Sequence, residues 1–201
     1  MSLTTYNELK AAVANFAHRA DLSSSLDDLV TLAEKRIMRE VRATEMETAL
    51  SASIAAAGTL SAPSGFLGLK NAYVNTSPTT KLTVVSLAQL LTRYPQRTSE
   101  DVPQVIAYDA GTFHFGPFPD STYAVKGTYY KRQGPLSSAV YDLFSNNPDL
   151  YLFASLAELE PFLKNDKRIA TWEAKYQGIK NAINTEAQNI GFAGGMAVTV
   201  A

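Results

Sequence analysis

The spacing of apolar residues changes twice along this chain of 201 residues, and that change restricts the possible folds more than any other feature. Near both ends, apolar residues recur every three or four positions, which is the period of an amphipathic helix. From about residue 46 they alternate with polar residues, and glycine and proline interrupt them at short intervals. Short β-strands joined by turns have this pattern. The sequence therefore predicts helices at both ends and a β-rich middle.

Two helices are expected before residue 46. Thr5 and Glu8 have the spacing of a capping box at the start of the first helix, and Ser25 opens the second helix with Asp28 three residues later. Only the short polar segment RADLSSS separates the two apolar stripes. A short connection between amphipathic helices favours an antiparallel helical hairpin.

The middle of the chain contains several short β-type runs. In residues 46–54, apolar or small residues occupy alternate positions, as expected for a half-buried strand. The segments DAG (109–111) and PDS (119–121) are predicted to be turns that join neighbouring antiparallel strands. One short helix is expected from Ser86 to about Tyr94, where Pro95 ends it.

Helical signals return in the most apolar stretch of the chain, NPDLYLFASLAELEPFLK (147–164). Asn147 suits the N-cap and Pro148 the first helical position, whereas Pro161 is expected to kink or end this helix. The stretch carries charged residues and is shorter than the roughly 20 apolar residues that a membrane span needs. A last long helix is expected from about Asp166 to Gly191.

We therefore predict an α+β protein in which N- and C-terminal helical hairpins form a four-helix bundle, with a β-rich antiparallel insert between them. The predicted bundle comprises residues 1–45 and 146–190, and the insert comprises residues 46–145. Residues 191–201 are predicted to be a flexible C-terminal tail.

The composition excludes several kinds of chemistry. The chain has no cysteine, which rules out disulfides, thiolate metal sites and cysteine nucleophiles. Its net charge of −1 gives no overall basic field for holding a nucleic acid. The two histidines, His18 and His114, have no partner at metal-ligand spacing, and no known catalytic or nucleotide-binding motif is present. We expect no catalytic residue, metal or cofactor, and no membrane association.

One group of basic residues could have a role in binding. Lys35, Arg39 and Arg42 have i, i+4, i+7 spacing and so line one side of the second helix. They could track phosphates or meet an acidic neighbour. The alternative is a solvated face that nearby glutamates balance.

The order of several segments resembles the head–tail adaptor, or connector, proteins of tailed bacteriophages. The resemblance covers roughly residues 4–184. The matching segments include TYNELKAAVANFAHRADL, LAEKRIMREVRATEMET, LSAPSGFLGLKNAYVN, FHFGPFPDSTYAVKGTYYKR and NPDLYLFASLAELEPFLK. No single segment is diagnostic, and the specificity lies in their order.

This resemblance implies an architectural function rather than an enzymatic one. Such adaptors form a ring, typically of twelve copies, that joins the portal protein to the tail tube or nozzle protein and lines the channel through which DNA passes. The expected location is the head–tail junction of the virion, after synthesis in the host cytoplasm. A near-neutral lining would let DNA slide past without holding it.

Candidate interface residues follow from the same resemblance. Tyr151 and Phe162 could pack against neighbouring subunits from the apolar helix. In the tail, the candidates are Phe192, Met196, Val198 and Val200, because no charged residue follows Glu186 and the last three alternate along the chain. We expect this tail to add as a strand to an adjacent subunit, the portal or the tail, the alternative being a disordered end.

Two other functions stay open at this stage. The β-rich insert could be a binding module that holds a carbohydrate or single-stranded nucleic acid through Tyr129, Tyr130 and Lys131. The chain could also be a small hydrolase that uses carboxylates brought together by the fold. Monomeric behaviour with ligand affinity would favour the first, and activity lost with one Asp or Glu would favour the second.

Overall fold

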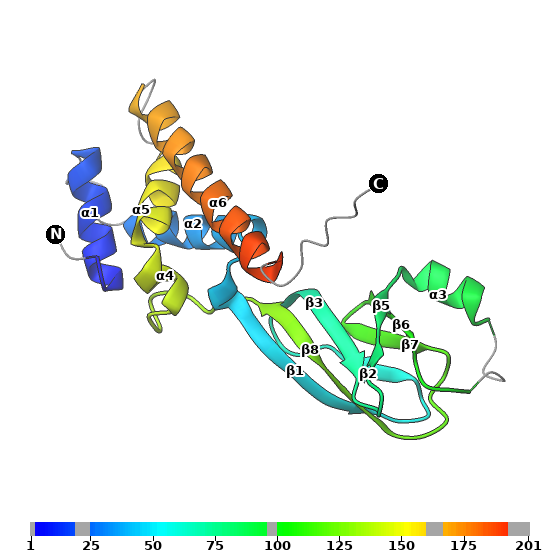
Figure 1. The fold of residues 1–201 in the computed structure, drawn as a ribbon. Helices are drawn as coiled ribbons and strands as arrows, with labels where there is room; N and C mark the ends of the chain where they lie inside the picture. The colour runs from blue at the N-terminus through cyan, green and yellow to red at the C-terminus, as the bar shows by residue number, and fades with distance from the viewer. Residues whose placement is uncertain (1–2, 19–24, 96–99, 160–166, 193–201) are drawn as a thin grey trace, which may run out of the picture. The chain divides into compact units, whose positions relative to one another are not determined.

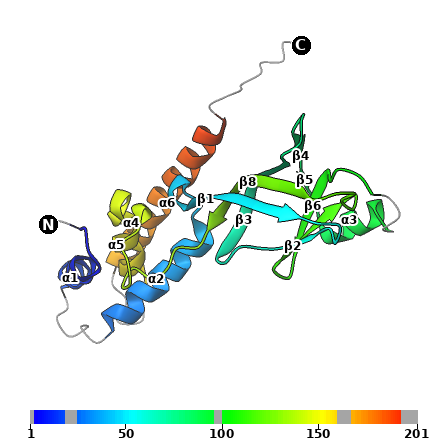
Figure 2. The same ribbon diagram turned by 90° about the horizontal axis from the view of Figure 1, so that it is seen from below.

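The computed structural model describes residues 3–18, 25–95, 100–159 and 167–192, without the side chains of residues 191 and 192. The chain divides into two compact units. A helical unit combines the residues up to Met46 with those from Gln133 onward, and a β unit consists of Glu47–Arg132. Figures 1 and 2 show the elements of each unit. The predicted domains, a bundle of residues 1–45 and 146–190 and an insert of residues 46–145, stay a prediction, as does their independent folding.

Helix α1 (Tyr6–Ala17) begins with the capping box predicted at Thr5. The Thr5 hydroxyl accepts a hydrogen bond from the backbone N–H of Glu8 at 3.3 Å. The Glu8 carboxylate accepts one from the backbone N–H of Thr5 at 3.0 Å. These contacts satisfy N–H groups that have no partner within the helix, and the predicted capping box is confirmed.

Helix α2 (Leu26–Glu40) begins where it was predicted, but the Ser25 side chain makes no capping hydrogen bond. The Asp27 carboxylate instead binds α1, accepting hydrogen bonds from the Tyr6 hydroxyl at 2.7 Å and the Lys10 ammonium group at 2.8 Å. The start of α2 is therefore fixed to α1 by side chains rather than by a cap. A 3₁₀ turn, η1 (Thr44–Met46), follows α2 and ends this part of the helical unit.

Helix α5 (Pro148–Ala157) is the central element of the helical unit. It contacts α1, α2, the short helix α4 (Asp142–Asn146) and the long helix α6 (Arg168–Phe192). Its buried side chains are Leu150, Tyr151, Leu152, Ala154, Ser155 and Leu156. Successive residues of a helix are about 100° apart, so these six cover most of its circumference. A helix that is apolar on most sides is stable only when several neighbours enclose it.

The strands of the β unit form two four-stranded sheets. The first sheet has the order β1 (Glu47–Ile54), β8 (Tyr123–Lys131), β3 (Phe66–Val74) and β4 (Thr80–Lys81). The second has the order β2 (Thr59–Ser61), β7 (Thr112–Gly116), β6 (Val105–Asp109) and β5 (Thr83–Val84). Both sheets contribute to one apolar core, which includes Ile54, Val74, Ile106, Phe113, Phe115 and Val125. Helix α3 (Leu87–Arg93) contacts β6 and β7 of the second sheet.

The two predicted turns have different outcomes. The segment DAG joins β6 and β7 as an antiparallel hairpin, and Ala110 and Gly111 take the positive φ angles of 43° and 81° that a tight two-residue turn requires. This turn is confirmed. The segment PDS separates β7 from β8, which lie in different sheets, so the prediction that it joins neighbouring antiparallel strands is wrong.

The predicted fold class is also wrong in its arrangement, although the chain is α+β. The strands form two sheets rather than a single antiparallel insert, β5 and β6 are parallel, and α3 accompanies them. The helical unit is organised around α5 instead of two paired hairpins, and α6 is 25 residues long. The physical reason is the apolar circumference of α5, which needs more than one partner.

Two glycines of the first sheet allow a matched test of packing. A Cβ atom at Gly127 of β8 would collide with the carbonyl oxygen of Asn71 in β3, whereas a Cβ atom at Gly68 would have no atom within 4 Å. We expect Gly127→Ala to lower the free energy of unfolding of the β unit by about 1–3 kcal/mol, because the strands would have to separate. Gly68→Ala should change it by no more than about 0.5 kcal/mol. Urea unfolding monitored by circular dichroism would measure both values, and equal effects would show that the close approach of β3 and β8 is unimportant.

We further expect the helical unit to fold without the β unit. Replacing residues 47–132 by a short Gly/Ser linker should leave a helical protein that melts cooperatively, because the buried side chains of each unit pack within that unit. The shortened chain must keep the residues from Gln133 onward, because the backbone N–H of Leu136 donates a hydrogen bond to the Glu34 carboxylate of α2 at 2.7 Å. Thermal unfolding followed at 222 nm is the measurement. Loss of the helical signal in the shortened chain would mean that the helical unit needs the β unit to fold.

Candidate functional site

The three basic residues singled out in the sequence do not act as one stripe. Lys35 and Arg39 are exposed on α2, and neither pairs with a carboxylate within the described part of the chain. The guanidinium of Arg42 instead donates hydrogen bonds to the carbonyl oxygens of Val41 at 2.6 Å and Met38 at 3.2 Å. Arg42 therefore satisfies carbonyl groups at the end of α2, while Lys35 and Arg39 are available for an outside partner.

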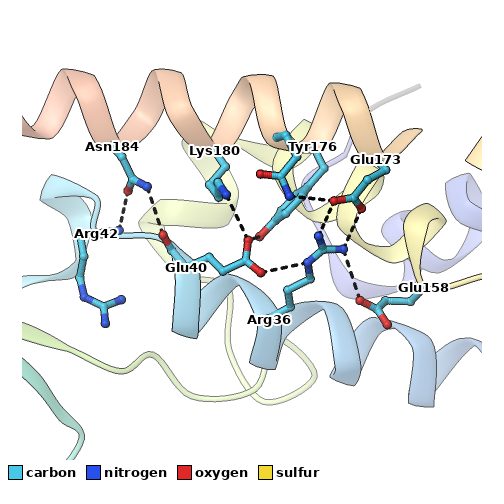
Figure 3. A network of polar contacts seen from close by, with 9 residues as sticks. Arg36, Glu40, Arg42, Glu158, Glu173, Tyr176, Lys180 and Asn184 are labelled. Atoms are coloured by element: carbon cyan, nitrogen blue, oxygen red, sulfur yellow. Dashed lines mark hydrogen bonds and ion pairs between the residues drawn. The ribbon is translucent and has the colours of Figure 1, made fainter. Parts of the chain in front are cut away.

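A different residue of the same helix, Arg36, is the centre of a polar network (Figure 3). Its guanidinium donates two hydrogen bonds to the Glu173 carboxylate of α6, at 2.9 Å and 2.6 Å. It also donates to Glu40 at 3.2 Å and lies 3.6 Å from a carboxylate oxygen of Glu158, which follows the last residue of α5. The same group stacks over the Tyr176 ring, 4.4 Å from its centre. Arg36 thus joins α2 to both α5 and α6.

Helix α6 provides a row of polar side chains along α2. Glu40 accepts hydrogen bonds from the Tyr176 hydroxyl at 3.1 Å and the Lys180 ammonium group at 3.4 Å. One turn further, the Asn184 amide donates to the carbonyl oxygen of Glu40 at 3.1 Å and accepts from the backbone N–H of Arg42 at 2.8 Å. Residues three or four apart lie on one side of a helix, so this row fixes the register of α6 against α2.

The charges of this network stabilise one another. The hydrogen bond from Arg36 is the largest influence on Glu173 and lowers the pKa of its carboxyl group. Burial raises the pKa of Glu40, but hydrogen bonds from Arg36 and Tyr176 and the positive charges of Arg36 and Lys180 together outweigh it, so this pKa is also below its ordinary value. The hydrogen bond to Glu173 raises the pKa of Arg36. All three groups are therefore held in their charged forms.

Of the predicted interface residues, only the side chain of Tyr151 lies in the described part of the chain. Tyr151 is only 3% exposed and packs edge-on against Phe144 at 5.2 Å between ring centres, so its side chain is part of the helical core. Phe192 is the last residue of α6, but its side chain, Phe162, Met196, Val198 and Val200 all lie outside the described residues. No interface function is proposed for Tyr151.

The β unit has an apolar hollow that the sequence did not reveal. Its volume is about 210 Å³, and it is lined by Phe66, Leu67, Gly68, Leu69, Val84, Ile106, Tyr108 and Phe113. The aromatic rings form a contacting cluster, with Phe66 at 4.8 Å from Tyr108 and 5.1 Å from Phe113 between ring centres. These residues come from four β-type segments, LSAPSGFLGLK, KLTVV, QVIAYD and TFHFG, and only the fold brings the four together.

The residues of the binding-module alternative do not form a stacking platform. Tyr129 is 5% exposed and belongs to the core, where its ring centre lies 5.9 Å from that of Phe66. Tyr130 is half-buried and points to the face opposite Tyr129, because successive side chains of a strand point to opposite faces. The aromatic residues of this segment are thus divided between core and surface.

A second hollow, in the helical unit, bears on the hydrolase alternative. It is about 270 Å³ in volume and is lined by Thr44, Glu45, Asn146, Asn147, Ile183, Glu186 and Ala187. Burial raises the pKa of Glu45, but hydrogen bonds, chiefly from the Asn146 amide, outweigh it and keep the pKa below its ordinary value. An ionised carboxylate with amide donors is a poor general acid. No group of three or more His, Cys, Asp or Glu residues in the described chain is placed to hold a metal ion.

These features are typical of a structural protein: its polar network joins helices, and among the described residues Lys35 and Arg39 of α2 have no carboxylate partner. The sequence comparison agrees with this class. Residues 4–198 match the model of the SU10 adaptor protein family. The chain belongs to this family of phage head–tail adaptors. No curated protein matches the chain significantly in sequence. Among the described residues, no helix has the length and apolar character needed to cross a membrane.

The network makes Arg36 the residue of α2 whose loss should matter most. Its side chain is only 17% exposed, and removing it would leave three carboxylates without their shared cation. We expect Arg36→Met to lower the free energy of unfolding by about 2 kcal/mol, less than the ~3–5 kcal/mol of a fully buried pair. Arg39→Met is the matched control and should cost no more than about 0.5 kcal/mol. Urea unfolding of the two variants measures both effects.

The effect of Arg36→Met should also depend on pH. Because Glu40 and Glu173 have lowered pKa values in the folded protein, their contribution is complete above the ordinary glutamate pKa of about 4.3. This contribution to the free energy of unfolding is lost as the pH falls through the pKa values that Glu40 and Glu173 have in the folded protein. The difference between wild type and variant should therefore be largest at neutral pH and shrink below about pH 4. A difference that stays constant across this range would mean that Arg36 acts by packing alone.

Proposed function

We propose that the chain forms a ring at the head–tail junction of a phage particle, where it joins the portal protein to the tail tube or nozzle and surrounds the DNA channel. The observation that carries this proposal is the match to the adaptor family over residues 4–198. The match spans both the helical and the β unit, so it concerns the whole chain and not a shared module. A ring of twelve copies is the stoichiometry that the resemblance implies.

The helical unit has the rigidity that a component of such a ring needs. Arg36 and its partners connect α2, α5 and α6 through contacts that depend on direction as well as distance. Such contacts resist sliding of the helices, which apolar packing alone permits more easily. This rigidity supports a structural function at a junction through which DNA is driven.

The exposed cations of α2 are the best candidates for a charged contact in the assembly. Lys35 and Arg39 are one turn apart, exposed, and without a carboxylate partner among the described residues, and the neighbouring Leu32 is 50% exposed. A cationic and apolar strip of this kind suits an acidic surface of an adjoining subunit or protein. Because such contacts are screened by salt, assembly through them should weaken at high ionic strength.

The test is assembly with the cognate portal protein. We expect a mixture of the purified chain and portal to give a large complex with cyclic symmetry, detectable by sedimentation velocity and cryo-electron microscopy. Each protein alone is the reference. A chain that stays monomeric beside a correctly assembled portal, and that binds a carbohydrate or turns over a substrate, would refute the adaptor proposal.

Two double variants test the charged contact within the same experiment. Lys35→Glu with Arg39→Glu reverses two exposed cations of α2 and should weaken the complex. Lys126→Glu with Lys131→Glu, at exposed positions of β8, makes the same change in net charge and should have a smaller effect. Equal effects would place the α2 cations outside the interface and leave the ring proposal unchanged.

A further inference from the structure

The apolar hollow of the β unit is open at the edge of the second sheet. Val84 of β5 and Tyr108 of β6 are 59% and 48% exposed, whereas Ile106 and Phe113 behind them are buried. Strand β5 is the last strand of its sheet, and its one strand partner among the described residues is β6. Apolar side chains therefore lie next to an unpaired strand edge.

The backbone of β5 is oriented to accept another strand. The N–H groups of Thr83 and Val85 donate to Gln104 and Ile106, on the side of β6. Backbone groups alternate in direction along a strand, so the N–H and C=O of Val84 point away from β6 toward the open edge. An unpaired edge next to an apolar hollow favours strand addition, in which backbone hydrogen bonds give affinity and side-chain pockets give specificity.

The C-terminal segment of the chain has the matching chemistry. The eight residues that line the hollow carry no charge, so a charged occupant would lose its hydration without gaining a partner. The chain has no charged residue after Glu186, and Met196, Val198 and Val200 alternate with smaller residues. As an added strand, this segment would direct these three side chains to one face.

We propose that the C-terminal segment of one copy, through Val198 and Val200, adds to the β5 edge of a second copy and fills its apolar hollow. This inference rests on the proposed ring. A ring needs an interface with two different surfaces, a donor and an acceptor, so that every copy supplies one and receives the other. The tail and the hollow form such a pair, and each copy has one of each.

The absence of cysteine from the chain makes disulfide trapping a sharp test. We expect the double variant Val84→Cys with Val198→Cys, oxidised gently during assembly, to form covalent dimers and higher multimers. Leu91→Cys with Val198→Cys is the matched control, because Leu91 is 53% exposed on α3 of the same unit but does not line the hollow. The control should form few multimers, and a reducing agent should return all species to monomers.

Each other outcome of the trapping experiment contradicts the proposal. A disulfide that forms only within monomers would place the tail in the hollow of its own chain. Equal trapping at residues 84 and 91 would indicate an unspecific tail, and no trapping in assembled rings would exclude the contact. In that last case, assembly with the portal would still support the ring proposal, and only the contact between tail and hollow would be excluded.

Mixing two blocked variants provides a second measurement. Val84→Asp blocks the acceptor and Val198→Asp the donor, and each alone should weaken self-assembly at least about tenfold because a carboxylate would enter an apolar site. An equimolar mixture should form pairs that grow no further, since only one intact tail and one intact hollow can meet. Leu91→Asp should assemble as wild type does. Circular dichroism checks folding, and a mixture without pairs would overturn the proposal.

Discussion

The ion pair between Arg36 of α2 and Glu173 of α6 joins positions 137 residues apart and fixes the register of these two helices. Apolar side chains bury surface without specifying direction, whereas a guanidinium that binds one carboxylate with two hydrogen bonds sets both distance and angle. The further contacts to Glu40 and Glu158 extend this control to the end of α5. The apolar helix α5 can then be enclosed by its neighbours in one register. In this way a few polar contacts set the relative positions of α2, α5 and α6, and a much larger buried apolar area stabilises that arrangement.

Membership of the adaptor family gives these features a common purpose. An adaptor needs a rigid part that keeps its shape and surfaces that are completed only by other proteins. The helical unit provides the first, through its polar network. We propose that the exposed cations on α2 and the open apolar hollow of the β unit provide the second. The structure thus separates the residues that hold the subunit together from those that we propose hold the assembly together.

The sequence predicted the features that depend on neighbouring residues. The capping box of Thr5 and Glu8 and the hairpin at residues 109–111 are local, and both are present. The error at PDS arose because a turn has the same sequence pattern whether the next strand returns to the same sheet or crosses to another. The predicted arrangement of helices was wrong because the helix at 147–164 was expected to pair in a hairpin, whereas the buried residues of α5 cover most of its sides.

The candidate site was harder to predict than the fold. The regular spacing of Lys35, Arg39 and Arg42 predicted a cationic site but did not distinguish Arg36, although Arg36 and Glu40 have the i, i+4 spacing of a helical ion pair. Its main partner, Glu173, is remote in sequence, and no local pattern connects the two. Both units bury apolar side chains, but the helical unit also has the charged network around Arg36. Sodium chloride should therefore weaken chiefly the helical unit, by screening this network, whereas sulfate should strengthen apolar burial in both units. The salt in which the particle is kept thus acts on the two parts of each subunit to different extents.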